Sequence, residues 1–450
     1  MSIFRPRWTA GGPFDDTSSV HPNNQQMRDL AKVDDGVQGH HSPETWFFAA
    51  ERLSSALPTF PWAKFRLAYV HLLLEDLDGA MELFQEARKL ISNADATFEE
   101  YFASLKAAVE EENRKAELAW SHPEDDGVIV QHWHPPRDFD AFRHQFPSHT
   151  SELLREWHSY QQKLGPDIAA QRYARLAAVQ SSELEDVFTL GGESLNRIVR
   201  AGFFGHAVDR VLKGPPGGIE HIVQILRDFK RCLNYFSASV LPADAISQDD
   251  LRSMHRELMK SSRIGFVHTD DDSPIPYLNM VGDYRRRLVI ADMNPEDANE
   301  DEPPRIVQFA RHQEIELHMQ TFLEMMHERL SKFTLGTGDP IAFALAAWIH
   351  YHLAVIHPFT DGNGRLGRIV SSLPLLKAGF PPINIRRCMK PKYLEALHKA
   401  ATTQDLGFLT ELIASEMRES IRYLSTLHPP SSDDSQWRLN INDGVTRIVI

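Results

Sequence analysis

The sequence has little cysteine, no long apolar run and no excess of positive charge. Its 450 residues include two cysteines, Cys232 and Cys388, too few for a disulfide scaffold or a cysteine-rich zinc site. The longest apolar run, residues 341–349, is far shorter than the ~20 residues that cross a bilayer. Lys and Arg number 48 against 62 Asp and Glu. The resulting net charge of −14 disfavours nucleic acid and anionic membranes as partners.

The remaining composition is that of a globular protein. Apolar residues make up 42% of the chain and aromatic residues 10%, which excludes disorder as the dominant state. Residues 1–30 are polar and contain no apolar segment of the kind found in signal peptides. The sequence therefore predicts a soluble protein without a transmembrane segment, located in the cytoplasm, with the nucleus left open.

Composition and periodicity divide the chain into five predicted parts. They are a loose lead (1–42), a helical domain (43–120), a linker (121–147), a large helical domain (148–428) and a tail (429–450). The lead has turn-forming residues but no apolar period, and the linker is rich in Asp, His and Pro. The tail contains Asn442-Asp443-Gly444 between alternating apolar residues, which indicates a hairpin.

The helical domain at 43–120 contains two apolar stripes with helical spacing, separated by a turn at residues 75–79. In the second stripe Ala80 and Phe84 are four residues apart, and Ala87 follows one turn later. This pair of helices resembles one tetratricopeptide unit. An ordinary helical hairpin is the alternative, because no second clean copy occurs at the repeat period.

The segment most indicative of chemistry is 357–368, which reads His-Pro-Phe-Thr-Asp-Gly-Asn-Gly-Arg-Leu-Gly-Arg. It predicts a helix that stops before Pro358, a loop with two glycines, and a second helix that begins near Gly364. A glycine-rich loop at a helix N-terminus exposes backbone N–H groups and makes an anion site. Arg365 and Arg368 are three residues apart, so they share a helix face and suit a polyphosphate.

Two further residues of this segment add reactive groups. Asp361 provides a carboxylate of the kind that Mg²⁺ prefers beside phosphate oxygens, and His357 has a pKa suited to accept a proton from a hydroxyl. Each residue alone is explained by a helix cap or a surface ion pair, but those roles leave Gly362, Asn363 and Gly364 unexplained. The segment therefore indicates a nucleotidyl or phosphoryl transferase with His357 as the base.

The segment resembles the signature of the Fic (filamentation-induced-by-cAMP) family, His-x-Phe-x-Asp/Glu-Gly-Asn-Gly-Arg-x-x-Arg, at every defined position. The resemblance extends over about residues 172–425. It implies an all-α fold, in which a Fic core bundle carries a short flap β-hairpin, and transfer of AMP from ATP to a Ser, Thr or Tyr hydroxyl of a protein. The kinase-like Doc relatives lack the full glycine and arginine set, so nucleotidyl transfer is favoured. A homodimer is a further implication.

The resemblance also assigns roles within the motif. It implies His357 as the general base and Asp361 as the ligand of Mg²⁺ or Mn²⁺. Three residues, Gly362, Asn363 and Gly364, would hold the α- and β-phosphates. The guanidinium groups of Arg365 and Arg368 would hold the β- and γ-phosphates.

A second segment, 282–290, resembles the flap hairpin that pins a target peptide by strand addition in this family. The residues expected to bind the target are Arg287, Leu288 and Val289. The alternative is a structural hairpin with solvated arginines, since three arginines follow one another at 285–287.

The helix that contains Tyr393 resembles the one that borders the adenine pocket in animal tetratricopeptide-bearing Fic adenylyltransferases, so Tyr393 is expected at the nucleotide. Leu394 and Ala401 stand where an aromatic residue and an Asn are expected. This departure weakens the predicted preference for adenine and leaves other nucleotides open.

Residues 181–186, Ser-Ser-Glu-Leu-Glu-Asp, follow the inhibitory pattern Ser/Thr-x-x-x-Glu-Gly/Asn of Fic proteins whose brake helix precedes the core. Ser181 and Glu185 are four residues apart and share a helix face. The resemblance implies that Glu185 pairs with Arg368 where the γ-phosphate binds. Asp186 departs from the pattern, and a carboxylate on a solvated helix is the alternative for Glu185.

Three functions are consistent with these features. The first is an autoinhibited protein adenylyltransferase, with ATP and hydroxyl-bearing proteins as partners. The second is removal of AMP, or transfer of another nucleotide. The third is a non-catalytic scaffold that senses a nucleotide, although an intact His357 and Asp361 disfavour it.

Overall fold

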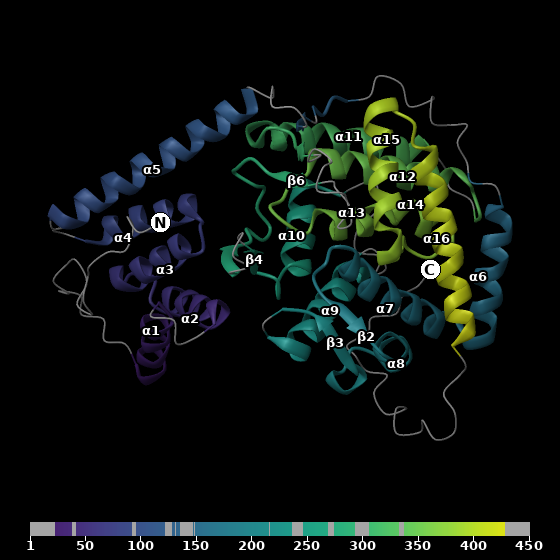
Figure 1. The fold of residues 1–450 in the computed structure, drawn as a ribbon, viewed down its shortest axis with the longest axis horizontal. Helices are drawn as coiled ribbons and strands as arrows, with labels where there is room; N and C mark the ends of the chain where they lie inside the picture. Colours follow the sequence, from purple (N-terminus) through teal and green to yellow (C-terminus); the bar gives the residue numbers. More distant parts are fainter. Residues whose placement is uncertain are drawn as a thin grey trace, which may run out of the picture. The chain divides into compact units, whose positions relative to one another are not determined.

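The computed structural model describes residues 23–37, 42–91, 96–121, 128–130, 132–135, 147, 149–215, 217–235, 246–268, 274–292, 306–332 and 337–427 (Figure 1). The chain divides into two compact units. The first comprises Met1–His122 and Ser262–Asn279, and the second comprises Pro123–Ser261 and Met280–Ile450. The chain therefore leaves the larger unit after Ser261, contributes a segment to the smaller one, and re-enters the larger unit at Met280.

The smaller unit consists of five helices and a hairpin among its described residues. They are α1 (Asn24–Val37), α2 (Pro43–Ala56), α3 (Pro61–Leu73), α4 (Leu77–Leu90), α5 (Ala96–Ser121), β4 (Ile264–His268) and β5 (Pro274–Leu278). Side chains cap two of the helices: Ser42 accepts from the amide of Thr45, and Asp76 accepts from the amide of Gly79. The aromatic rings of α3 and α4 meet in the core, where Phe65 packs edge-on against Phe84.

Helix α1 differs from the expected loose lead. Val33 is fully buried and shares a core cluster with Phe47, and Asp29 forms a 2.8 Å ion pair with Arg52 of α2. The helix has few apolar residues, and helices of this length are stabilised mainly by packing. The periodicity of the lead therefore did not reveal it.

The β4–β5 hairpin is antiparallel and was not predicted. It pairs Ile264 with Leu278, and both side chains lie in the cluster formed with α1 and α2. The amide of Leu278 donates to the carbonyl of Leu74 at 2.9 Å. Arg263, just before β4, forms a 3.0 Å ion pair with Glu51. These contacts attach the hairpin to the helical unit.

The larger unit is mostly helical, which confirms the expected all-α class. Its helices are α6 (Thr150–Leu164), α7 (Pro166–Leu184), α8 (Ser194–Ala201), α9 (Gly218–Asn234), α10 (Gln248–Leu258), α11 (Ile315–Lys332), α12 (Ile341–Ile356), α13 (Asn363–Ser371), α14 (Leu373–Lys377), α15 (Lys390–Thr403) and α16 (Gly407–Thr426). Short 3₁₀ turns are η3 (Gly205–Ala207), η4 (His312–Glu314) and η5 (Arg387–Met389). Its strands are β1 (Val128–Val130), β2 (Thr189–Gly191), β3 (Arg210–Lys213), β6 (Ile290–Asp292) and β7 (Ile306–Gln308).

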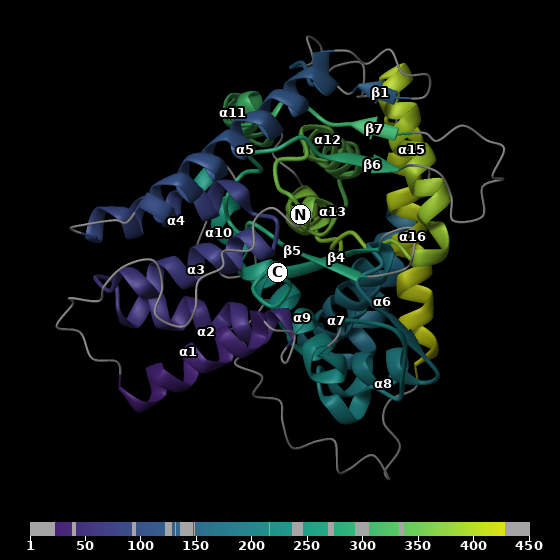
Figure 2. The same cartoon turned by 60° about the vertical axis from the view of Figure 1, so that its left-hand side comes forward.

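Helix α12 is the centre of this unit. Nearly every side chain along it is buried, including Trp348, as expected for a helix that is apolar on all sides. It packs against α11, α13, α14 and α16, and α13 lies beside it in both views (Figures 1 and 2). Because α12 and α13 pack against each other in a buried environment, the position of the loop that connects them is fixed.

Part of the expected linker is ordered against the larger unit. Strand β1 pairs in parallel with β7, and β7 pairs antiparallel with β6 (Figure 2). Trp133 is buried, and its indole N–H donates to Nδ1 of His352 at 2.9 Å. A linker without such contacts was expected at 121–147, but β1 and Trp133 belong to the larger unit.

The hairpin expected at 282–290 begins later than the sequence indicated. Residues 280–288 form bends and irregular backbone outside any strand, and the hairpin is β6 with β7. Gly282 has a φ of +82°, a conformation that interrupts a strand. Arg285, expected on a strand, is buried. The expected position of the hairpin at 282–290 is thus corrected to β6 and β7.

No helix among the described residues is both long enough and apolar enough to cross a membrane. The hairpin predicted in the tail lies outside the described residues.

Candidate active site

His357 is held at the end of α12 in a backbone conformation that a helix cannot continue. Its φ is +49°, and its amide donates to the carbonyl of Leu353 at 3.0 Å. The following Pro358 prevents further helix. Nδ1 of the imidazole lies 3.3 Å from the carbonyl oxygen of Ala354. Because a carbonyl only accepts, the proton belongs on Nδ1, and Nε2 carries the lone pair that a general base needs.

The surroundings of His357 favour the neutral imidazole. Burial, followed by the nearby charge of Arg285, lowers the pKa of His357 to about 3, against opposing effects of the Ala354 carbonyl and Glu185. The ring of Phe309 stacks on the imidazole with centroids 3.7 Å apart. His357 is therefore present as a base at neutral pH.

Asn363 has a different place from the one expected. Its Oδ1 accepts from the amide of Phe359 at 2.9 Å, and its Nδ2 donates to the Phe359 carbonyl at 2.7 Å. Phe359 is fully buried, and its ring stacks on His255 at 3.8 Å. The side chain of Asn363 thus fixes the shape of the loop by binding both backbone groups of Phe359. This structural role accounts for an Asn at the position without a side-chain contact to phosphate.

Close contacts leave no room for a side chain at either glycine of the motif, Gly362 before α13 or Gly364 in its first turn. Gly362 has a φ of +79°, and a Cβ on it would lie 2.7 Å from Sδ of Met259. Its amide donates to Oδ1 of Asp361 at 2.5 Å. A Cβ on Gly364 would overlap Oε1 of Glu185. The carboxylate of Glu185 therefore lies against the first turn of α13, where the helix favours an anion.

Arg365 and Arg368 are each only 1% exposed. Arg365 approaches Asp361 at 3.4 Å, but its Nε and Nη1 are buried and have no hydrogen-bond partner among the described residues, as is also true of Nη1 of Arg368. Buried guanidinium N–H groups are destabilising unless they are paired. These groups fit a ligand with several anionic oxygens, such as a polyphosphate.

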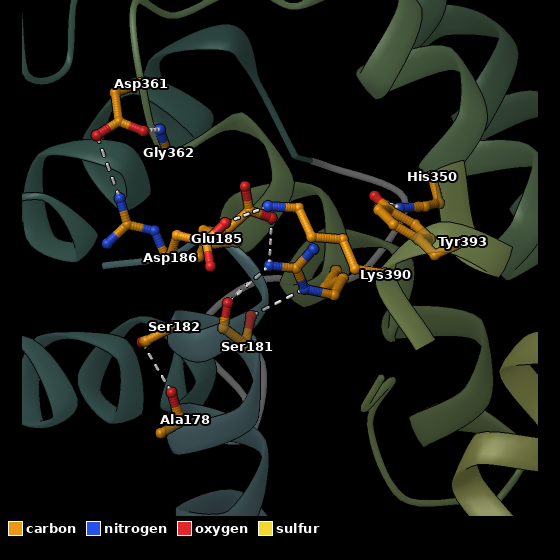
Figure 3. A network of polar contacts seen from close by, with 12 residues as sticks. Ala178, Ser181, Ser182, Glu185, Asp186, His350, Asp361, Gly362, Lys390 and Tyr393 are labelled. Carbon is orange, nitrogen blue, oxygen red and sulfur yellow. Dashed lines mark hydrogen bonds and ion pairs between the residues drawn. The ribbon is translucent and has the colours of Figure 1, made fainter. Parts of the chain in front are cut away.

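The predicted inhibitory residues meet Arg368. Oε1 of Glu185 lies 2.7 Å from Nη2 of Arg368. Nε of the same arginine donates to the hydroxyl of Ser181 at 2.8 Å, and Nη2 donates to the Ser181 carbonyl at 3.0 Å. Figure 3 shows Ser181 and Glu185 at the centre of this network, with Asp361 and Gly362 to one side. Residues at the end of α7 therefore bind the guanidinium of Arg368, which was expected to bind phosphate.

Glu185 is held as a carboxylate. Burial acts to raise its pKa, but the charge of Arg368 and its hydrogen bond, together with the charges of Arg365 and Lys390, outweigh burial, so the net shift is downward. The side chain of Glu185 is 31% exposed, but its carboxylate pairs with a buried arginine, which distinguishes it from an unpaired carboxylate on a solvated helix face.

Asp186, the departure from the inhibitory pattern, fits the turn. Its φ is +54°, in the left-handed region that Asp and Asn adopt more readily than most residues. Its carboxylate forms a 3.1 Å ion pair with Arg387 and a second ion pair with Lys390. The extra carboxylate therefore attaches the end of α7 to η5 and α15.

Tyr393 is buried and lies near Arg368. Its hydroxyl is 2.8 Å from Nε2 of His350 (Figure 3), and burial raises the pKa of Tyr393 to about 12. Burial, followed by the charge of Arg368, lowers the pKa of His350 to about 4. The expected contact of Tyr393 with a nucleotide base remains a prediction.

The carboxylate of Asp361 is 38% exposed at the mouth of the loop. The described residues contain no group of three or more His, Cys, Asp or Glu side chains that could hold a metal ion. A single carboxylate is sufficient for Mg²⁺, which usually keeps waters and takes further oxygens from substrate phosphates. The donor set at Asp361 thus fits Mg²⁺ bound together with a nucleotide.

The residues expected in the flap lie beside the catalytic loop. Arg287, Leu288 and Val289 are partly buried. The carbonyl of Val289 accepts from the amide of Phe309 at 3.2 Å, which extends the β6–β7 ladder by one pair. Sequence reasoning missed Phe309 as a contact of His357, because no spacing rule connects the two positions.

A base with its lone pair at a loop mouth, a carboxylate beside it and two buried arginines at a helix N-terminus define a site for chemistry on a polyphosphate. Residues 245–375 match the model of the Fic/DOC family. The chain therefore contains a Fic domain, as the motif predicted.

Curated relatives match over the same part of the protein. Protein adenylyltransferase fic-1 from Caenorhabditis elegans is 37% identical over 98 residues, which are 22% of this chain and 19% of the relative. Protein adenylyltransferase Fic from Nematostella vectensis is 30% identical over 169 residues, 37% of this chain and 32% of the relative. The matched part thus spans about a fifth to a third of these relatives.

Among solved structures, residues 134–508 of Fic-1 from C. elegans superpose with a TM-score of 0.38 and 17% identity, covering 91% of this chain and 100% of that chain.

Proposed function

We propose that this protein is a Mg²⁺-dependent protein adenylyltransferase that moves AMP from ATP to a Ser, Thr or Tyr hydroxyl of target proteins and of itself, and that Glu185 inhibits it. The main observation that supports this proposal is that the carboxylate of Glu185 pairs with Arg368 and lies against Gly364. An anion at this position competes with the phosphates of a nucleotide. The names of the curated relatives support AMP as the group that is transferred.

The geometry supports a separate role for each of these residues in the transfer reaction. Nε2 of His357 accepts the proton of the target hydroxyl as its oxygen bonds to the α-phosphorus. The bond between the α-phosphorus and the oxygen that bridges to the β-phosphate breaks, and pyrophosphate leaves. Arg365, Arg368 and the amides at the start of α13 hold the phosphate oxygens. When bound, Mg²⁺ supplies positive charge beside the separating phosphates, and Asp361 is the residue that would hold it.

The target segment is proposed to bind at β6. Within the described residues β6 pairs with β7 alone, so its other edge presents backbone groups to which an extended peptide can add. Arg287, Leu288 and Val289, just before β6, would contact that peptide. A homodimer is part of the proposal because the family resemblance implies it, and light scattering of the purified protein tests it.

Inhibition is proposed to act on the pose of ATP. Glu185 neutralises Arg368, and its carboxylate lies where the γ-phosphate would approach the guanidinium. A triphosphate in this site would meet a like charge, which disfavours the pose needed for transfer.

The proposal is tested by incubating the Glu185→Gly protein with Mg²⁺ and labelled ATP, CTP, GTP or UTP. Labelling from ATP that is lost in Glu185→Gly/His357→Ala supports adenylyl transfer. Labelling from another nucleotide changes the donor, and labelling from none favours a nucleotide-sensing scaffold. Release of AMP from pre-labelled protein by wild type, but not by His357→Ala, would instead favour de-AMPylation.

A further inference from the structure

Arg285 is a buried arginine whose side chain binds only backbone in the described structure. It is 2% exposed. Its Nε donates to the carbonyl of His357 at 2.7 Å, its Nη1 to the carbonyl of Arg287 at 2.8 Å, and its Nη2 to the carbonyl of Ala310. One guanidinium thus connects the catalytic loop to the chain on both sides of the β6–β7 hairpin.

This position is unusual for a charge. Among the described residues no carboxylate pairs with Arg285, and burial lowers the pKa of its guanidinium to about 10, which still leaves it protonated at neutral pH. A buried cation is destabilising unless its N–H groups are all directed at acceptors. The three contacts come from three separate nitrogens of a planar fork, whereas the ammonium of lysine donates from a single nitrogen, so lysine does not reproduce them.

The backbone around Arg285 reinforces the same connection. Its amide donates to the carbonyl of Pro358 at 2.9 Å. Three residues earlier, the amide of Gly282 donates to Nδ1 of His255 at 2.9 Å, and Nε2 of that histidine donates to the carbonyl of Asp361 at 2.9 Å. Residues 282–285 are therefore attached to the catalytic loop at both of its ends.

The three carbonyls lie next to groups that take part in the proposed reaction. The carbonyl of His357 belongs to the base itself. Ala310 follows Phe309, whose ring stacks on the imidazole, and Arg287 begins the segment that leads into β6. A shift of the guanidinium would therefore move the base relative to the strand that would receive the target.

We propose that Arg285 is a positioning residue for the transfer reaction, which holds the catalytic loop and the β6–β7 hairpin in one register so that the target hydroxyl meets Nε2 of His357. The proposal rests on the proposed function, because it assigns Arg285 to the alignment of base and target. It does not assign Arg285 to ATP binding, since its N–H groups are directed at protein carbonyls.

The test compares Arg285→Lys with Arg175→Lys, both in the Glu185→Gly protein. Arg175 is a matched control because it is also a buried arginine that donates to backbone carbonyls, those of Val199 and Arg200. Arg285→Lys should lower kcat for labelling by about 10- to 100-fold, as displacement of a reacting group by about 1 Å does. It should leave the KM for ATP within about twofold, whereas Arg175→Lys should leave both constants unchanged.

A fall in the affinity for ATP without a fall in kcat would overturn the proposal, as would equal kcat values for the two variants. Hydrogen exchange gives a readout that needs no activity. In Arg285→Lys, amide exchange should rise together at 287–290, 306–310 and 357–361. A rise in only one of these segments would contradict the shared register, even if the Glu185→Gly protein labels nothing and the proposed function fails.

A measurement without any substitution at Arg285 applies if Arg285→Lys does not fold. Native-state hydrogen exchange of the Glu185→Gly protein in low urea reports which segments open together. The flap and loop segments should open in one step with the same urea dependence. Separate openings would overturn the proposal.

Discussion

Two clusters of positive side chains receive the end of α7, and they differ in their access to water. The buried cluster, Arg365 and Arg368 of α13, is 1% exposed. The exposed cluster, Arg387 and Lys390 near the start of α15, is 38% and 35% exposed. Adjacent carboxylates bind them: Glu185 the first and Asp186 the second.

The exposure of each cluster determines the role of the carboxylate that binds it. Glu185 is a competitor, because it competes with a nucleotide for Arg368, whereas Asp186 is an anchor that attaches the end of α7. In the buried cluster the arginines themselves are shielded from water, so removal of the carboxylate leaves guanidinium groups that favour another anion. In the exposed cluster solvent screens the charges, and an ion pair there contributes about 0–1 kcal/mol. Two neighbouring residues of the same charge are thus expected to differ widely in their effect on nucleotide binding.

The largest effect should follow from loss of the buried cluster. In the Glu185→Gly protein, Arg368→Ala should lower the rate of labelling from ATP by about 100-fold or more, because removing one preorganised donor at a charged reacting group costs about 10²–10³ in kcat. Arg387→Ala is the matched control and should change the rate less than about threefold. Similar losses in the two variants, measured as initial rates, would contradict the comparison.

Removal of the competitor should have the next largest effect. Glu185→Gly should raise auto-AMPylation by roughly 5- to 150-fold, the range of typical coupling energies between competing sites. Glu185→Gln keeps the shape without the charge and should give part of this gain. Autoradiography with labelled ATP measures both, and equal labelling of wild type and Glu185→Gly would refute inhibition by Glu185.

Removal of the anchor should have a smaller effect. Asp186→Asn keeps a residue that tolerates a positive φ and removes only the ion pairs with Arg387 and Lys390. It should raise auto-AMPylation about two- to fivefold, and the gain should disappear at high salt, since salt screens exposed ion pairs. A gain as large as that of Glu185→Gly would show that the turn after α7, rather than Glu185, holds the inhibited state.

The site was predictable from sequence where its residues are close together in the chain. The loop and both arginines of α13 occupy twelve consecutive positions, and Ser181 and Glu185 are one helical turn apart, so spacing together with the family resemblance indicated that the members of each set lie close together. Asn363 was expected to hold phosphate, but the hydrogen-bond partners of its side chain are backbone groups of Phe359, which spacing does not reveal.

The unpredicted parts depend on contacts between distant positions. Arg285 and His357 are 72 residues apart, and Trp133 and His352 are 219 apart. Nothing in the local pattern of three consecutive arginines shows that the first is buried. Helix α1 and the β4–β5 hairpin were missed for the same reason, because packing against other elements stabilises them more than their own periodicity does.

The smallest expected effect concerns pH, because a buried His357 should make kcat nearly independent of pH around neutrality. The exclusion of water that makes Arg368 sensitive to its partner also lowers the pKa of His357 to about 3, with Arg285 contributing. A lowered pKa favours the neutral base, so protonation begins only well below pH 5. The kcat of Glu185→Gly at saturating ATP should therefore change less than about 1.5-fold between pH 7.5 and pH 6, whereas a histidine with the ordinary pKa of about 6.5 would lose about fourfold. An inflection near pH 6.5 would show that solvent reaches the base, and the contrast between the buried and exposed clusters would then not extend to His357.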